Sequence, residues 1–389
     1  KWLGFEADES PQKPGAFGPY RQIEREDKHL ESVEYLLSKN RAYKDDGGAV
    51  RLRYPDSTIH FKDLVCGDCA FEPKALGPEP VILRSNNTPT YHLASVSDDV
   101  AMNISHVIRG QDHLTNTAKH TVLFQALDAP VPEYAHLPLL LGEDGSKMSK
   151  RATDMLVSVG QFRDSGYTRE ALINFLMLLG WSHPEGLEQF TIEEVIEVFD
   201  FTRVGQTAAK FQFAKLDFLN GHWIRSLPVE ALESEAKNFV KEFQPLLEQK
   251  GDAYWKNSLS ILKQEAGSLK DLPRLYELVL SMTLPDSSEA INTIQQEQRT
   301  DAFKEVVTSW QATLRDQATS DGADSYTAEE FTALMKLVQK SVSADKKSVF
   351  QGIRFAITGA LRGPELKTVI SLITRELLLS RAEEALAKL

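Results

Sequence analysis

The spacing of hydrophobic residues changes along this chain, from mixed helix and strand patterns to an almost purely helical pattern. Residues 23–43 carry apolar side chains at helical spacing, whereas residues 50–71 alternate in places and predict short antiparallel strands. From Pro228 to Leu389 nearly every segment has helical spacing. Examples are Leu275–Met282, Phe331–Val342 and Leu366–Leu379. The pattern predicts an α/β part followed by an all-α part.

Strand and helix patterns alternate in the middle of the α/β part. The expected strands are Val81–Leu83, Thr90–Ala94, His106–Arg109 and Leu137–Leu141. Between the last two, a helix should begin near Leu114, with Asn116 or Thr117 as its cap. Strand, helix and strand in this order predict a βαβ crossover in a Rossmann-like parallel sheet. Ligands bind beyond the carboxyl ends of such strands, where Arg109 and residues 147–151 lie.

Local signals mark further boundaries in the chain. A strongly apolar helix should run from Arg169 to Leu179 and end at Gly180, and Thr191 should cap the next helix. The Ser/Asp/Gly-rich stretch Ala318–Ser325 predicts a linker between helical subdomains.

Composition limits the class of protein. The chain has 389 residues, 42% hydrophobic and 26% charged, and no apolar run approaches the roughly 20 residues that span a bilayer. Residues 1–6 resemble neither a signal peptide nor a transit peptide, so we expect a cytoplasmic protein, with an organellar matrix or stroma also open. A net charge of −12 argues against indiscriminate nucleic-acid binding but allows a local basic patch for RNA.

The two cysteines, Cys66 and Cys69, form a Cys-x-x-Cys pair. The pair supplies half of a four-cysteine zinc site, and no His-x-x-x-His follows it. Its flanks look like strand, whereas a redox pair normally opens a helix. We therefore expect an incidental pair in a reducing compartment, with no protein-bound zinc and no metal site.

The most informative motif is Lys147-Met148-Ser149-Lys150-Arg151, which follows a Gly/Asp-rich turn and an apolar run. A solvated basic turn is the alternative interpretation. The pentapeptide resembles the KMSKS loop of class I aminoacyl-tRNA synthetases. That resemblance implies that Lys147 and Lys150 are catalytic and stabilise the pyrophosphate leaving group.

Other segments resemble the glutamyl-tRNA synthetases within that class. They are Trp2–Gly4, Gly18–Arg25, Thr88–Ala94, Val107–Leu114, Ala171–Ser182, Lys215–Asn220 and Ile357–Ala360. The resemblance implies that Tyr91 and Arg109 bind glutamate. It also implies that Asp112, Lys147, Met148, Ser149, Lys150 and Arg151 bind ATP, which brings Mg²⁺ as part of the substrate complex.

The chemistry of the two glutamate-binding residues is sensible by itself. Arg109 can bind a carboxylate in a bidentate fork, and the Tyr91 hydroxyl can donate to another carboxylate oxygen. The alternatives are a half-buried strand tyrosine for Tyr91 and a surface ion pair with Asp98 or Asp99 for Arg109.

The resemblance implies five parts. They are the remainder of a first catalytic half (1–44), a shortened inserted acceptor-binding domain (45–88), a second catalytic half with the loop (89–151), a helical stem-contact domain (152–227) and a helical anticodon-binding domain (228–389). A helical interaction domain unrelated to RNA is the alternative for the last part. The implied reaction is ATP-dependent ligation of L-glutamate to tRNA(Glu), and also to tRNA(Gln) in some relatives. The implied enzyme is a monomer that does not bind a membrane.

Two departures limit the resemblance, and one is the abrupt stretch Ala42–Val50, where the family usually has a longer insertion. Family members carry an HIGH-type motif before the point where this chain begins, and no His-x-Gly-His occurs in it. We therefore expect this chain alone to be incomplete for catalysis. The competing hypothesis is a non-catalytic tRNA-binding paralogue that lost its HIGH half.

Overall fold

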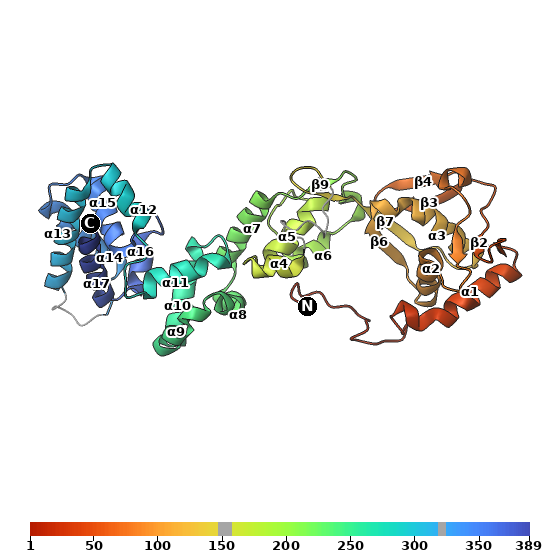
Figure 1. The fold of residues 1–389 in the computed structure, drawn as a ribbon, viewed down its shortest axis with the longest axis horizontal. Coiled ribbons are helices and arrows are strands. Elements are labelled where there is room, and N and C mark those ends of the chain that lie inside the picture. Colours follow the sequence, from red (N-terminus) through yellow and green to blue (C-terminus); the bar gives the residue numbers. More distant parts are fainter. Residues whose placement is uncertain (147–157, 318–323) are drawn as a thin grey trace. The chain divides into compact units, whose positions relative to one another are not determined.

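The computed structural model describes residues 1–146, 158–317 and 324–389, which form two compact units. The α/β unit comprises Lys1–Ser158 and Leu172–Leu216, and the helical unit comprises Val159–Ala171 and Asp217–Leu389. Their main hydrophobic cores share no residue. Figure 1 shows the course of the chain through its helices and strands. The expected order, an α/β part followed by an all-α part, is confirmed.

A four-stranded mixed sheet forms the centre of the α/β unit, in the order β4-β3-β7-β6. Its strands are β3 (Ile59–Asp63), β4 (Gly67–Phe71), β6 (His106–Gly110) and β7 (Glu133–Leu137). β6 runs parallel to β7, and β3 joins β7 in parallel through the pair Asp63 and Tyr134. β4 is antiparallel to β3. The carboxyl ends of three strands therefore meet at one edge, which brings together Asp63, Arg109 and His136.

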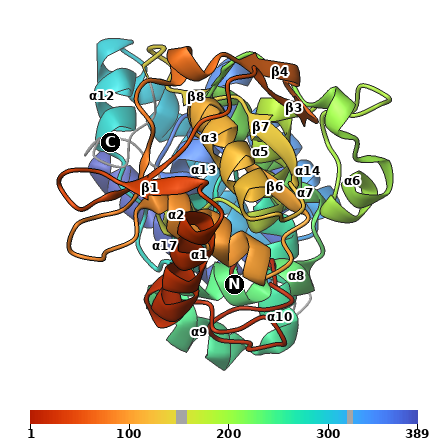
Figure 2. The same ribbon diagram turned by 90° about the vertical axis from the view of Figure 1, so that its right-hand side faces the viewer.

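Three helices accompany this sheet. They are α1 (Glu26–Ser38), α2 (Tyr91–Ala101) and α3 (Leu114–Ala126). α3 packs on β3 and on α2, and α2 packs on α1 (Figure 2). The crossover from β6 through α3 to β7 is a βαβ unit, as the sequence predicts, but its second strand is Glu133–Leu137 and not Leu137–Leu141.

Two predictions in this region are wrong. Thr90–Ala94 is not a strand: Thr90 is extended, and α2 begins at Tyr91. The buried residues Leu93, Ala94, Val96 and Ser97 have helical spacing, which a five-residue window does not reveal. Neither Asn116 nor Thr117 caps α3, because the short helix η3 (Gln111–His113) runs directly into it and makes His113 the N-cap.

The predicted helix over residues 23–43 is also too long. It divides into η1 (Gln22–Arg25), α1 and the strand β1 (Ala42–Lys44). Asn40 ends the helical run with a positive φ of 52°. β1 belongs to a second, antiparallel sheet with β2 (Val50–Leu52) and β5 (Val81–Leu83), which confirms the strand at Val81–Leu83. The short helix η2 (Pro73–Leu76) lies between β4 and β5.

The predicted strand Leu137–Leu141 is wrong, because Leu137 is the last residue of β7 and Leu140–Leu141 form the separate strand β8. Pro138 has no N–H to donate to a ladder, so β7 ends at Leu137 and β8 (Leu140–Leu141) pairs instead with β9 (Ala209–Lys210). Beyond it, α5 (Arg169–Gly180) confirms the apolar helix. Thr191 caps α6 (Ile192–Val198) as predicted, in a capping box with Glu194. The short helix η4 (Phe201–Arg203) follows.

The helical unit contains α4, most of α7 and the helices that follow, whereas residues 213–216 of α7 belong to the α/β unit. The helices are α4 (Val159–Asp164), α7 (Phe213–Ser226), α8 (Val229–Phe239), η5 (Lys241–Phe243), α9 (Gln244–Lys250), α10 (Asp252–Leu262), η6 (Lys263–Glu265), η7 (Leu269–Asp271), α11 (Leu272–Leu280), α12 (Ser288–Gln296), α13 (Thr300–Gln317), α14 (Ala328–Ser341), α15 (Lys346–Thr358), α16 (Leu366–Val369), η8 (Ile370–Leu372) and α17 (Arg375–Lys388). α10 packs against α8 and α9, and α13 packs against α14, α15 and α17 (Figure 1). The predicted helix Leu366–Leu379 is wrong in its continuity, because extended backbone at Ile373 and Thr374 separates α16 and η8 from α17.

Two predicted segments fall outside the description. The loop 147–151 lies outside the described residues, and so does most of the predicted linker Ala318–Ser325. Among the helices of the described residues, none combines the length and hydropathy needed to cross a lipid bilayer.

Candidate active site

Arg109 is the centre of the candidate site. It lies at the carboxyl end of β6, directly opposite His136 of β7 in the parallel register. Its guanidinium donates from Nη1 to the Tyr91 hydroxyl at 3.0 Å, from Nη2 to Thr117 Oγ1, and from Nε to His136 Nε2 at 3.4 Å. Three separate elements therefore hold this cation: α2, α3 and β7.

An ion pair with Asp98 or Asp99 does not account for Arg109 in the described part of the chain. Asp98 lies 2.8 Å from His29 Nε2. Burial raises the pKa of Asp99 to about 6 even though Arg109 attracts the charged form. Among the described residues Arg109 therefore forms no ion pair with either acid, although Asp99 attracts its charge.

Tyr91 and Arg109, which the sequence predicts to act together, are in contact. Tyr91 is the first residue of α2 and is 46% exposed, so it is not a half-buried strand tyrosine. Its hydroxyl accepts from Arg109 and lies 3.4 Å from His113 Nδ1. The position leaves the hydroxyl in reach of a ligand bound to Arg109.

Histidine rings surround Tyr91. The rings of His92, His113 and His120 lie within 6.0 Å of the tyrosine ring, and His92 Nδ1 lies 3.1 Å from His120 Nε2. Burial, followed by repulsion from Arg109, lowers the pKa of His120 to about 3. Burial also lowers the pKa of His92. The rings of His92 and His120 are therefore neutral at pH 7.

A buried polar pair behind Arg109 was missed by sequence reasoning. Asp63 Oδ2 lies 2.6 Å from His136 Nδ1, and both side chains are fully buried. A signal for it was present: each residue is a polar side chain at the end of an apolar strand segment. The sequence does not, however, say that β3 and β7 are neighbours.

Asp112 lies just beyond the end of β6, in η3, and is exposed. A Cβ on Gly110 would meet Asp112 Oδ1 at 2.6 Å, so the Asp112 carboxylate lies over Gly110. Asp112 is thus next to Arg109 in the same turn, as the sequence predicts.

The turn that precedes residues 147–151 is well defined. The Gly142 N–H donates to the Ser146 carbonyl at 2.8 Å, and Asp144 Oδ1 accepts from the N–H and hydroxyl of Ser146. Gly145 has a φ of 80°, which favours glycine. This Gly/Asp turn is what the sequence predicts ahead of the basic residues.

Arg109 also borders an apolar pocket of about 500 Å³ within the α/β unit. Side chains such as Leu137, Trp181, Phe199 and Phe201 line the pocket, and Arg109 is the charged residue among its described lining. A ligand at this edge would meet one cation, neutral polar groups and an apolar wall.

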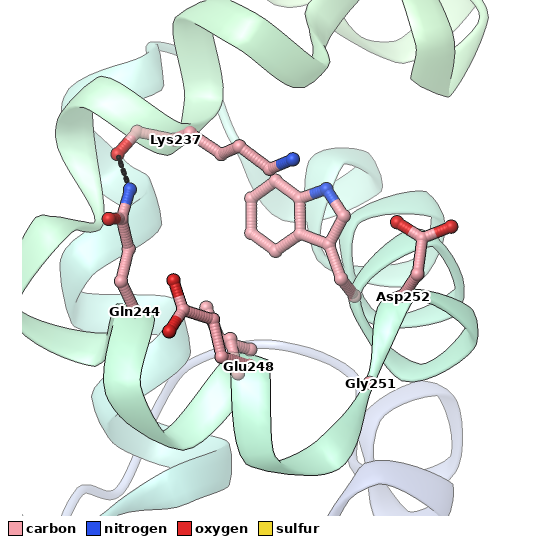
Figure 3. Close-up of a pocket in the computed structure, with 7 residues that line it drawn as sticks. Lys237, Gln244, Glu248, Gly251 and Asp252 are labelled. Atoms are coloured by element: carbon pink, nitrogen blue, oxygen red, sulfur yellow. Dashed lines mark hydrogen bonds between the residues drawn. The ribbon is translucent and has the colours of Figure 1, made fainter.

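One pocket in the helical unit has a different chemistry. It measures about 360 Å³ and lies among α8, α9 and α10. Figure 3 shows Lys237 with Glu248 and Asp252 around it. Lys237 is already paired with Glu233 at 2.6 Å, and the two acids repel anions. This pocket is therefore unsuited to a carboxylate or a phosphate.

The cysteine pair is not reactive. Cys66 and Cys69 are free thiols on the β3–β4 hairpin. Burial raises the pKa of Cys66 and raises that of Cys69 to about 11, which disfavours the thiolate needed for redox chemistry or metal binding. No cluster of His, Cys, Asp and Glu among the described residues could hold a metal ion.

Known proteins resemble this chain over nearly its whole length. A family model for the catalytic domain of class I tRNA synthetases (E and Q) matches residues 46–218, and one for an anticodon binding domain matches residues 238–386. A glutamate–tRNA ligase of Natranaerobius thermophilus is 31% identical, with 100% of this chain and 86% of the relative covered. One of Methylacidiphilum infernorum is 35% identical, with 98% and 83% covered. A solved glutamate tRNA ligase of Elizabethkingia meningosepticum, in complex with its amino acid, shares the fold with a TM-score of 0.79 and 23% identity, over 99% of this chain and 87% of that one.

Proposed function

Because the chain belongs to the glutamate–tRNA ligase family, we propose that it joins L-glutamate to tRNA and cleaves ATP to AMP and diphosphate. The first step is attack of the glutamate α-carboxylate on the α-phosphorus of ATP, which gives glutamyl-adenylate. The tRNA then takes the glutamyl group from the adenylate. Such chemistry needs positioning and charge neutralisation rather than a covalent enzyme intermediate.

The arrangement around Arg109 is the observation that carries the proposal. A guanidinium has five N–H donors, and three contacts to Tyr91, Thr117 and His136 use three of them. One N–H remains on each terminal nitrogen, and a carboxylate can accept both. We therefore assign Arg109 and Tyr91 to glutamate.

Asp112 and the loop 147–151 are assigned to ATP. Asp112 lies one turn from Arg109, so a nucleotide bound there would be next to the glutamate site. Lys147 and Lys150 would neutralise the charge that develops on the diphosphate leaving group, and Met148, Ser149 and Arg151 complete the loop. Mg²⁺ enters with ATP as part of the substrate.

The helical unit is assigned to tRNA, since an anticodon-binding family model covers most of it. The proposed acceptor is tRNA(Glu), and tRNA(Gln) is the second RNA to test. We propose further that the enzyme acts as a monomer in the cytoplasm.

The test is Arg109→Ala in the protein as its gene encodes it. Loss of a charge-assisted bidentate contact should cost about 2–4 kcal/mol, so the glutamate KM should rise about 30-fold or more. The affinity for ATP and tRNA should stay nearly unchanged, because neither needs this fork. The measurements are glutamate-dependent pyrophosphate exchange with tRNA present, aminoacylation, and tRNA binding.

Arg41→Ala provides the control, since Arg41 contacts Asp128 and the carbonyl of Ala126 on the same unit. It should leave the glutamate KM unchanged. An unmoved KM in Arg109→Ala, or an equal loss of tRNA affinity, would refute the assignment. A non-catalytic tRNA-binding protein, the competing function, would show tRNA binding without any exchange.

A further inference from the structure

His136 contacts Arg109 and is itself paired with Asp63, whose carboxylate is held by backbone N–H groups. Asp63 Oδ1 accepts from the backbone N–H groups of Val65 at 2.9 Å, Cys66 at 2.7 Å and His136 at 3.2 Å. Burial raises the pKa of Asp63, but the hydrogen bonds from Cys66 and His136 outweigh it and lower the pKa overall. The carboxylate is therefore ionised and fixed in place.

This carboxylate sets the tautomer of His136. Asp63 Oδ2 can only accept, so the 2.6 Å contact requires the proton on Nδ1. Burial lowers the pKa of His136 despite the attraction of Asp63, so the ring is neutral and Nε2 is an acceptor. Nε2 faces Thr117 Oγ1 at 2.8 Å and Arg109 Nε at 3.4 Å.

The contacts form a continuous buried chain from a carboxylate to the guanidinium. The Thr117 hydroxyl is 0% exposed and accepts from Arg109 Nη2; it lies 2.8 Å from His136 Nε2 and 3.2 Å from the His113 carbonyl. Because Nε2 is an acceptor, we assign the hydroxyl proton to the shorter contact, so that Thr117 donates to His136. His136 contacts Nε of Arg109 and Thr117 contacts Nη2, so the two residues fix one edge of the guanidinium. If His136 carried its proton on Nε2 instead of Nδ1, an N–H would face the Arg109 guanidinium, and the chain of hydrogen bonds from Asp63 to Arg109 would be broken.

We propose that Asp63, His136 and Thr117 are positioning residues that orient Arg109 toward the carboxylate of glutamate. The proposal rests on the assignment of Arg109 to glutamate. The three side chains touch no substrate and act through the guanidinium. The competing explanation is that they only stabilise the junction of β3, β7 and α3.

Thr117→Val gives the sharpest test, since valine keeps the shape and removes the hydroxyl. We expect the glutamate KM to rise about tenfold, the factor for one lost hydrogen bond to a charged group, with the ATP KM and tRNA affinity changed less than twofold. Thr117→Ser should recover most of the affinity. Asp63→Asn, which no longer fixes the tautomer, should raise the glutamate KM at least as much.

The matched control is Thr121→Val, one turn further along α3. Thr121 is equally buried, but its hydroxyl donates to the Thr117 carbonyl at 2.9 Å and does not contact Arg109. It should change stability without changing the glutamate KM. If Thr117→Val and Thr121→Val change only stability, the three residues are structural and the proposal is wrong.

A double mutant separates this proposal from the assignment it rests on. In the Arg109→Ala background, Thr117→Val should have no further effect on the glutamate KM, because the residue that it positions is gone. A further rise in the glutamate KM, as large as in the single mutant, would refute the positioning role but not the role of Arg109 in binding glutamate. An unchanged KM in Arg109→Ala itself would overturn both.

Discussion

Arg381 lies wholly inside the helical unit and donates to backbone carbonyls. Its guanidinium contacts the carbonyls of Glu277, Leu278 and Ser281 at the end of α11, and that of Ile357 in α15. Burial lowers the pKa of Arg381 to about 10, which leaves it charged at pH 7. The cation satisfies carbonyls that a helix end leaves without partners and lies at the negative end of the helix dipole.

Arg381→Met should destabilise the protein by about 3 kcal/mol, since it leaves buried carbonyls unpaired. The control is Arg315→Met, because Arg315 pairs with Glu383 at 2.8 Å with both side chains more than half exposed. An exposed pair of this kind is worth about 0–1 kcal/mol. Urea unfolding of both variants checks the difference, and equal losses would contradict the role given to Arg381.

His120 should make stability depend on pH. Its pKa is about 3 in the folded protein, mainly because it is buried, and about 6.5 in an unfolded chain. Below pH 6.5 His120 is therefore protonated in the unfolded state but not in the folded state. The free energy of unfolding is at its full value above that pH and falls as the pH drops toward 3. Between pH 7 and pH 5.5 the wild type should lose about 1 kcal/mol more than His120→Gln.

At the scale of elements, capping boxes begin several helices of the chain. The Thr327 side chain accepts from the Glu330 N–H at 3.2 Å, and Glu330 Oε2 accepts from the Thr327 N–H at 2.7 Å. They begin α14, whose Phe331, Leu334 and Val338 are buried in the core of the helical unit. The cap therefore stabilises an element on which the core depends.

Thr327→Ala should reduce the free energy of unfolding by about 1 kcal/mol, whereas Thr327→Ser should retain most of it because serine also accepts the capping bond. Thermal unfolding of the two variants checks this. A serine variant as unstable as the alanine variant would show that the methyl group matters rather than the cap.

Element boundaries show which parts of the fold the sequence could predict. α5 and the start of α6 were predictable because their signals are local: a long apolar helix ending in Gly180 and a capping threonine at 191. Tyr91 was assigned to a strand because five residues do not distinguish the two periods. The β7 residues His136 and Tyr134 lie opposite Arg109 and Asp63 because of the strand register, which is a long-range property that the local sequence does not reveal. Arg109, Tyr91 and Asp112 were named as a site, but Asp63 and His136 behind them were not.

At the scale of the whole molecule, the main cores of the two units share no residue. The α/β core joins residues between Val33 and Tyr134, whereas the helical core joins residues between Ile224 and Ala385. Cooperative unfolding depends on packing within a core. We therefore expect two thermal transitions rather than one.

Calorimetry of three samples tests this expectation. Arg381→Met should lower one transition by about 5–10 °C, since its contacts lie in the helical unit, and should leave the other in place. A non-hydrolysable analogue of glutamyl-adenylate, at 100 times its Kd, should raise the other transition through about 2.7 kcal/mol of binding, because Arg109 and Tyr91 belong to the α/β unit. Arg315→Met should move neither. A single transition that both the ligand and Arg381→Met displace would show that the units unfold together, because the same cooperative structure would then hold the glutamate site and the buried arginine.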